Sequence, residues 1–323
     1  MGRYLIRRVL FMILVLWIIS ILTFVIFVKL PPGDPARRVA GKTTTPATIA
    51  AARKALGLDE PVIVQYARFA KGLVPLPGFW LNEEVYYSWS NQISVKEQMV
   101  SRMPVTITLA VGAAVLWLLM GIPTGIISAV RRRSVADRSA MLFALVGVSA
   151  PTFWLGLVFL YVFWSKLGWF PSSGLEIEAS MWQSIAEGKF WLPWITLAIT
   201  NAAFYTRMVR GNMLETMTED YVRTARAKGL SERKVIYRHA LRASLTPVVT
   251  MLGLDVATLL GGAIITEKVF ALQGLGGYAI GAITTNDFPA VMGVTILAAV
   301  FIVVANLIVD VMYAVLDPRV KYS

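Results

Sequence analysis

Residues 219–247 of this chain read EDYVRTARAKGLSERKVIYRHALRASLTP. Glu219 and Asp220 carry the negative charge that stabilises the positive N-terminal end of a helix. Gly229 is a natural left-handed residue just past a helix C-terminus, and Ser231 is a natural N-cap for a second helix. The stretch therefore predicts two helices joined by a tight Gly-Leu turn.

Three residues of the first helix, Val222, Ala225 and Gly229, share one face at spacings of three and four. Small side chains there should leave a shallow surface on which another protein can sit. Two other interpretations stay open: a plain basic connector, or a DNA-reading helix-turn-helix, which the turn and the basic second helix resemble. Apolar segments hold both ends of the stretch and no dimerisation module accompanies it, so we expect no nucleic-acid partner.

The rest of the chain has the composition of a protein that lies in lipid. Of its 323 residues, 57% are hydrophobic and 15% are charged, whereas soluble domains carry about 25% charge. A helix needs roughly 20 apolar residues to cross a bilayer. Six stretches reach or approach this length, and the fourth is the weakest because it is short and carries Thr196, Thr200 and Asn201. They are 9–30, 105–129, 140–164, 190–206, 243–266 and 289–316.

Lys and Arg are concentrated in alternate connections between these stretches. The connection 207–242 holds nine basic and four acidic residues, whereas 166–189 holds two basic and three acidic ones. Because cytoplasmic loops carry the excess of Lys and Arg, we expect both termini and the 219–247 stretch to be cytoplasmic. The net charge of +12 is then explained by the basic residues of these loops. The partner that surrounds the spans is the lipid bilayer.

The 219–247 stretch resembles the EAA loop of binding-protein-dependent ABC importers, in which a coupling helix docks on an ATP-hydrolysing subunit. The literal Glu-Ala-Ala is absent, since the opening residues here are Thr224, Ala225 and Arg226, but the motif glycine corresponds to Gly229. The resemblance implies that the contacts to the ATPase come from Glu219, Asp220, Ala225, Ala227, Gly229, Leu230 and Ser231.

Further motifs, in order along nearly the whole chain, resemble the B-type permease of dipeptide and oligopeptide importers. They are Tyr4-Leu5-Ile6-Arg7-Arg8, Pro32-Gly33-Asp34-Pro35, Leu56-Gly57-Leu58-Asp59-Glu60-Pro61, Arg102-Met103-Pro104-Val105-Thr106, Glu267-Lys268-Val269-Phe270, Gly274-Leu275-Gly276 and Asp317-Pro318-Arg319. One segment, 72–95, departs from the family pattern, which usually has a short Gly-Asp-Leu-Gly there. It contains Pro75, Pro77, Trp80 and Trp89 instead.

The resemblance implies an all-α integral membrane protein of six transmembrane helices with the type I ABC importer permease fold. We expect an N-terminal helix (1–30), an external loop domain (31–101), a five-helix core (102–316) with its coupling loop (207–243), and a cytoplasmic tail (317–323). Within the external domain, Thr45 and Pro46 should start one helix, Gly57 should end it, and Pro61 should begin the next. The expected location is a bacterial or archaeal cytoplasmic membrane.

No phosphate-binding G-x-x-x-x-G-K-[ST] loop occurs in the sequence, so any driving ATPase must be a separate polypeptide. The resemblance implies a second homologous permease, two ATP-binding subunits or domains that hold ATP and Mg²⁺, and an external substrate-binding lipoprotein. We expect no cofactor on this chain. We also expect no enzymatic activity and no metal site, since there is no cysteine and the single histidine, His239, has no convergent partners.

Ionisable residues inside a span are costly and usually face a cavity or a partner. Asp255 lies in the middle of the fifth span, where it either meets the amino group of a peptide or makes a buried bond. Asp310 in the sixth span is interpreted as structural. The candidate translocation path is Asp255, Gly262 and Glu267, and the resemblance implies an outer gate at Gly274, Gly276 and Gly277.

These observations predict the permease subunit of an ATP-driven importer that moves dipeptides and oligopeptides by alternating access. Three alternatives remain open. The first is an ion-coupled secondary transporter that uses Asp255 and Asp310. The second is a permease for another cargo, such as nickel complexes or sugars, and the third is a membrane scaffold or receptor that moves nothing.

Overall fold

The computed structural model describes residues 2–30, 34–39, 45–73, 81, 86–172, 174, 180–261 and 263–316. Helices dominate these ranges, in which strand-like geometry is limited to one antiparallel bridge between Tyr87 and Ser94. The all-α prediction is therefore confirmed for the described residues. The predicted tail 317–323, the proline- and tryptophan-rich part of 72–95 up to Trp80, and Gly262 lie outside them.

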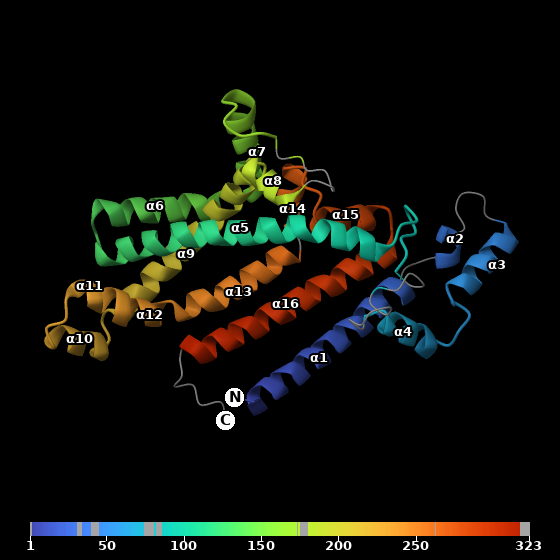
Figure 1. The fold of residues 1–323 in the computed structure, drawn as a ribbon, viewed down its shortest axis with the longest axis horizontal. Helices are drawn as coiled ribbons and strands as arrows, with labels where there is room; N and C mark the ends of the chain where they lie inside the picture. The colour runs from blue at the N-terminus through green and yellow to red at the C-terminus, as the bar shows by residue number, and fades with distance from the viewer. Residues whose placement is uncertain are drawn as a thin grey trace.

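The bundle is built from long helices that run side by side, and its two ends carry different short elements (Figure 1). Its long members are α1 (Gly2–Phe24), α5 (Val95–Val130), α9 (Trp191–Thr216), α13 (Thr246–Leu260) and α16 (Phe288–Leu316). The end at which α1 starts carries α10 (Asp220–Ala227), α11 (Glu232–Lys234) and α12 (Leu241–Ser244). The opposite end carries α2 (Pro35–Val39), α3 (Pro46–Ala55) and α4 (Val62–Lys71).

Length and hydropathy mark three helical segments as able to cross a membrane: Ile6–Lys29, Val95–Val130 and Phe288–Met312. Two bent pairs, Val135–Ser149 with Thr152–Lys166 and Glu232–Ser244 with Thr246–Leu260, raise this number to five if each pair forms one span. The remaining predicted span, 190–206, lies in α9, whose polar residues keep it outside this set. The described residues thus support three to five of the six predicted spans.

The second predicted span begins earlier than expected, at Val95 instead of residue 105. The 36 residues of α5 correspond to a length of about 54 Å at 1.5 Å per residue. A bilayer core is only about 30 Å thick. The first turns of α5 must therefore project beyond the hydrocarbon region, toward the end that carries α2–α4.

The third predicted span, 140–164, is not one continuous helix. α6 (Val135–Ser149) and α7 (Thr152–Phe159, continued by a π turn Leu160–Lys166) meet at an angle of 100°. Pro151 lacks an N–H group and forces the preceding residue into an extended conformation, and Ala150 accordingly has ψ 121°. A proline bends a helix, and here the angle of 100° turns α7 away from the bundle (Figure 1).

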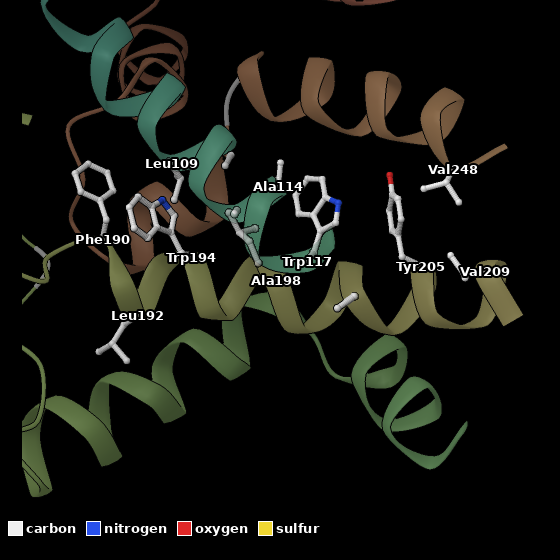
Figure 2. Close-up of a cluster of buried hydrophobic side chains, with 14 of the residues drawn as sticks. Leu109, Ala114, Trp117, Phe190, Leu192, Trp194, Ala198, Tyr205, Val209 and Val248 are labelled. Atoms are coloured by element: carbon white, nitrogen blue, oxygen red, sulfur yellow. The ribbon is translucent and has the colours of Figure 1, made fainter. Parts of the chain in front are cut away.

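The centre of the core lies between α5 and α9 (Figure 2). Gly121 and Gly125 of α5, which have the G-x-x-x-G spacing typical of closely packed helices, face Tyr205 and Val209 of α9. A Cβ atom at either glycine would lie 2.7–2.8 Å from the Cβ atom of that neighbour. The two helices therefore approach each other closely at these glycines. Because the surroundings of α9 are largely protein, this helix can carry polar residues.

Gly253, Ala257 and Gly261 form a ridge of small residues, four positions apart, that is a packing surface of α13. A Cβ atom at Gly253 would fall 1.9 Å from Val309 Cγ2 of α16, and one at Gly261 would fall 3.4 Å from Ala298 Cβ. The side of α13 that carries this ridge therefore lies directly against α16. Asp255, two residues from Gly253 and about 200° around the helix, points away from α16.

Helices α3 and α4 follow their predicted boundaries. Thr45 forms a capping box with Thr48 at the start of α3, Gly57 has φ +63° after its end, and Pro61 precedes α4. Asp34, just before α2, bonds to Arg53 of α3. This guanidinium and the backbone N–H of Ala36 hold the pKa of the Asp34 carboxyl below its ordinary value.

Contacts with α1 and with the π turn Val25–Lys29 that follows it fix α4 to the bundle. Tyr66 of α4 shares a hydrogen bond of 2.8 Å with Ser20 and packs edge-on against Phe24, with ring centroids 5.6 Å apart. Lys29 Nζ donates to Gln65 Oε1 at 2.8 Å. The segment that contains α4 is thus held by the C-terminal end of α1 and the turn after it.

Candidate functional site

The first candidate site is the pair of helices formed by residues 219–245, which we call the basic hairpin. Gly229 has φ +75°; its N–H donates to the carbonyl of Arg226 and that of Leu230 donates to Ala225. This pair of backbone hydrogen bonds is the Schellman motif that ends helices at a left-handed glycine. The predicted stop at Gly229 is confirmed, and the chain re-enters a helix directly after Ser231.

One expectation about this hairpin is wrong. Val222 and Ala225 do not form an open surface, because α10 folds back and buries them against Val235 and Leu230. The apolar stripe of this short amphipathic helix finds its partner within the chain, in the π turn Val235–Ala240. Only the other side of α10 is therefore open to a partner.

The exposed side of the hairpin carries the remaining predicted coupling residues. Glu219, Asp220, Ala227, Gly229 and Ser231 are exposed and Leu230 is half-buried. No other atom lies within 4 Å of a Cβ built on Gly229, so the turn faces open space.

One ion pair ties the two arms of the hairpin together. Arg226 Nη2 lies 2.8 Å from Glu232 Oε1, and this carboxylate raises the pKa of the Arg226 guanidinium. The hairpin is thus an ordered, charged projection with its glycine turn exposed.

The second candidate site surrounds Asp255. Its Oδ2 accepts a hydrogen bond of 2.7 Å from Tyr205 Oη of α9. Tyr205 is fully buried, and its ring lies against that of Trp117, with centroids 6.0 Å apart. The sequence singled out Asp255 alone; nothing in the pattern indicated that Tyr205 would reach it.

The second intramembrane carboxylate is held by an arginine. Asp310 of α16 accepts from both Nε and Nη2 of Arg8 in α1, forming a two-pronged ion pair. A pairing of this kind neutralises the charge and pins α1 to α16. The structural interpretation of Asp310 is supported by these contacts.

Glu267 and the predicted gate glycines form one cluster. Glu267 lies in α14 (Ile264–Val269) and is fully buried. Its Oε1 accepts from Thr106 Oγ1 of α5 at 2.8 Å, and its Oε2 accepts from the N–H of Gly277 in α15 (Leu275–Thr284) at 2.7 Å. Thr106 Oγ1 in turn accepts from the N–H of Leu275 at 2.9 Å. This cluster, which we call the glutamate knot, joins three helices.

Gly274 and Gly276 pack directly on the knot. A Cβ atom at Gly274 would lie 2.3 Å from Glu267 Oε1, and one at Gly276 would lie 3.1 Å from Oε2 and 2.8 Å from Ile264 Cγ1. The glycines are needed so that the start of α15 can close over the carboxylate. The predicted roles of Glu267 in the path and of the glycines in a gate stay predictions.

Sequence reasoning missed a buried ion cluster at the end of the bundle that carries the basic hairpin. Asp137 of α6 accepts from Arg210 of α9 at 2.7 and 3.1 Å, from Ser128 Oγ of α5, and from the N–H of Arg133. Only the Ser134–Asp137 spacing, an N-cap signature, was visible in the sequence. The cluster locks three helices together next to the basic hairpin.

Replacing Asp137 with alanine should destabilise the protein by about 3–5 kcal/mol, because Arg210 would keep a partly buried charge without its counter-ion. Thermal unfolding of the purified protein measures the effect. Arg138→Ala, an exposed neighbour, is the matched control and should change stability by less than about 0.5 kcal/mol. Equal stability of the two variants would contradict the role of the cluster.

Metal binding finds no support in the described residues, where no three His, Cys, Asp or Glu side chains come together. The features that remain are an exposed capped hairpin, a carboxylate held by tyrosine, and the glutamate knot. The hairpin projects from one end of the helical bundle, and the other two features lie within it.

Two family models match the chain. Residues 121–322 match the binding-protein-dependent transport system inner membrane component, and residues 1–110 match the N-terminal part of the same kind of component. The chain belongs to this family. Members are the membrane components of ABC transporters, which work in membrane-embedded complexes with separate ATPase partners.

Curated relatives cover the full length. The oligopeptide transport system permease protein AppB of Bacillus subtilis is 36% identical over 330 residues, with all of both chains covered. The glutathione transport system permease protein GsiC of Escherichia coli K12 is 37% identical over 323 residues, again with full coverage. A chain of the MetNI methionine ABC transporter, solved in inward-facing conformations, shares the fold: TM-score 0.54, 20% identity, 69% of this chain and 97% of that chain.

Proposed function

We propose that this ABC permease imports peptides across a bacterial or archaeal cytoplasmic membrane. The observation that carries the proposal is full-length similarity to permeases named for oligopeptides and for glutathione, itself a peptide. In this proposal α9 also crosses the membrane, as the fourth of six spans, because it lies at the centre of the core alongside α5. Both termini and the basic hairpin face the cytoplasm, and α2–α4 face outward.

The working complex contains a second homologous permease, two ATP-binding subunits that carry ATP and Mg²⁺, and an external substrate-binding lipoprotein. ATP binding brings the ATPases together, and the basic hairpin transmits this motion to α9 and α13, which flank it in the chain. The path then opens alternately to the two sides. The exposed Gly229 turn and the charged side of α10 supply the docking surface.

The ion-coupled alternative loses support because one of its two carboxylates, Asp310, is already paired with Arg8. The choice between peptides and other cargo rests on the relatives, since the described residues show no metal-binding cluster that would favour a nickel complex.

The proposal predicts that the complete complex, reconstituted in proteoliposomes, takes up a labelled tripeptide only when ATP is present on the ATPase side. The rate of Mg²⁺-dependent ATP hydrolysis by the ATPase subunits should rise when the binding protein and the peptide are added together. Uptake driven by an ion gradient without ATP would contradict it. Uptake of a sugar or a nickel complex, and not of the peptide, would contradict the proposal that the cargo is a peptide.

A further inference from the structure

Asp255 is the one intramembrane carboxylate in the described residues that has an acceptor oxygen to spare. Its Oδ2 is held by Tyr205 at 2.7 Å, whereas no hydrogen bond of Oδ1 is found and this oxygen is not enclosed by the chain. No Lys, Arg or His nitrogen of the described residues lies within 4 Å of it. Asp310, by contrast, has both oxygens occupied by Arg8.

The surroundings of Asp255 hold its carboxylate in one direction. Tyr205 reaches across from α9 and is fully buried, and the indole nitrogen of Trp117 points toward Tyr205 from the α5 side (Figure 2). Trp117 Nε1 is itself buried without a hydrogen-bond acceptor. Tyr205 thus holds one oxygen of the carboxylate from the protein side, with Trp117 packed against it, and the other oxygen is left open by this chain.

The position of Asp255 on α13 is between a buried and an exposed stripe. Gly253 and Ala257 pack against neighbouring helices, while Leu254 and Thr258 are exposed on this chain. A carboxylate at the centre of a membrane-spanning helix is energetically costly. Such a residue is retained where a water-filled path or a cation faces it. The described part of this chain supplies no such cation.

We propose that Asp255 is a specificity-determining residue of the path that binds the N-terminal ammonium group of the transported peptide, with Tyr205 and Trp117 as positioning residues. The inference rests on the proposed function. A primary ammonium carries three N–H donors and a full positive charge, which complement the free carboxylate oxygen. The tyrosine hydroxyl keeps the other oxygen satisfied while the cargo is absent.

The test compares two labelled tripeptides, one with a free and one with an acetylated N-terminus, chosen so that the partner binding protein binds both with comparable affinity. The complete complex is reconstituted with ATP. Asp255→Asn should lower uptake of the free-amine peptide at sub-saturating concentration about tenfold, the size of a lost charge-assisted bond, and should leave the acetylated peptide nearly unchanged. Tyr205→Phe should lower the uptake of the free-amine peptide relative to the acetylated peptide by a smaller factor. Asp310→Asn should affect the uptake of both peptides equally.

Three results would overturn the inference. If wild-type protein takes up both peptides and Asp255→Asn changes them equally or not at all, the carboxylate does not read the ammonium group. If Asp255→Asn prevents assembly with the second permease in size-exclusion chromatography, the carboxylate pairs with that partner instead. If wild-type protein takes up neither peptide, the proposed function itself is wrong and the inference falls with it.

Discussion

Replacing Gly229 with valine should reduce cargo-stimulated ATP hydrolysis by the assembled complex about tenfold. Gly229 has φ +75°, a conformation that costs an L-residue roughly 1–2 kcal/mol and a β-branched one more. Every 1.4 kcal/mol corresponds to a factor of ten in population, so the docking-competent turn becomes rare. The side chain would also project into the open space in front of the turn, where we expect the ATPase to bind.

The chain offers a control with the same backbone strain. Gly168 has φ +62° and, like Gly229, no atom within 4 Å of a built Cβ. It follows the π turn that continues α7, and α7 lies away from α10 and α11 of the hairpin (Figure 1). Gly168→Val should leave the coupling of hydrolysis to uptake intact. Undiminished coupling in Gly229→Val, or an equal loss in both variants, would remove the basic hairpin from the mechanism.

Local backbone chemistry was the part of the fold that could be predicted from sequence. The capping box at Thr45, the left-handed Gly57 and Gly229, and the start at Pro61 each depend on one or two residues and their immediate neighbours. Close-packing ridges such as Gly253–Gly261 were also visible, because small residues four apart on a helix have few other uses in a membrane.

The features that sequence reasoning missed depend on the direction that the chain takes after a helix ends, and on contacts between residues far apart in the sequence. A proline predicts a bend but not its angle, so the right angle at Pro151 came only from the structure. Val222 and Ala225 formed the predicted face, but the fold-back that buries it depends on Val235, ten residues later. The Asp137–Arg210 pair joins residues 73 positions apart, and no spacing rule reaches that far.

Changing Glu267 to alanine should have the second large effect. Glu267 lies at the end of the fifth predicted span, where it was predicted to line the path, yet its carboxylate is fully buried among Thr106, Gly274 and Gly277. Alanine would leave the donors of Thr106 and Gly277 unpaired and open a cavity. At about 1–3 kcal/mol for each unsatisfied buried group, with the cavity added, we expect a loss of about 3–5 kcal/mol.

Graded substitutions separate an anchoring role for Glu267 from a cargo-binding one. Glutamine keeps one acceptor oxygen but places an NH₂ group against the second donor, so Glu267→Gln should lose about half as much stability as Glu267→Ala. Gly274→Ala should also destabilise, because its Cβ would lie 2.3 Å from Glu267 Oε1. Glu187→Ala, at a partly exposed glutamate paired with Lys189, is the control and should change stability little.

Thermal unfolding and peptide uptake, measured on the same preparations, then decide between the two roles. If Glu267 is an anchor, stability and uptake are both lowest in Glu267→Ala, intermediate in Glu267→Gln and highest in the wild type. The result should be the same for every peptide, because the start of α15 loses its contact with α5. A path residue predicts that Glu267→Ala is as stable as Glu187→Ala but transports some peptides and not others. The enclosure of both carboxylate oxygens by donors from α5 and α15 favours the anchor.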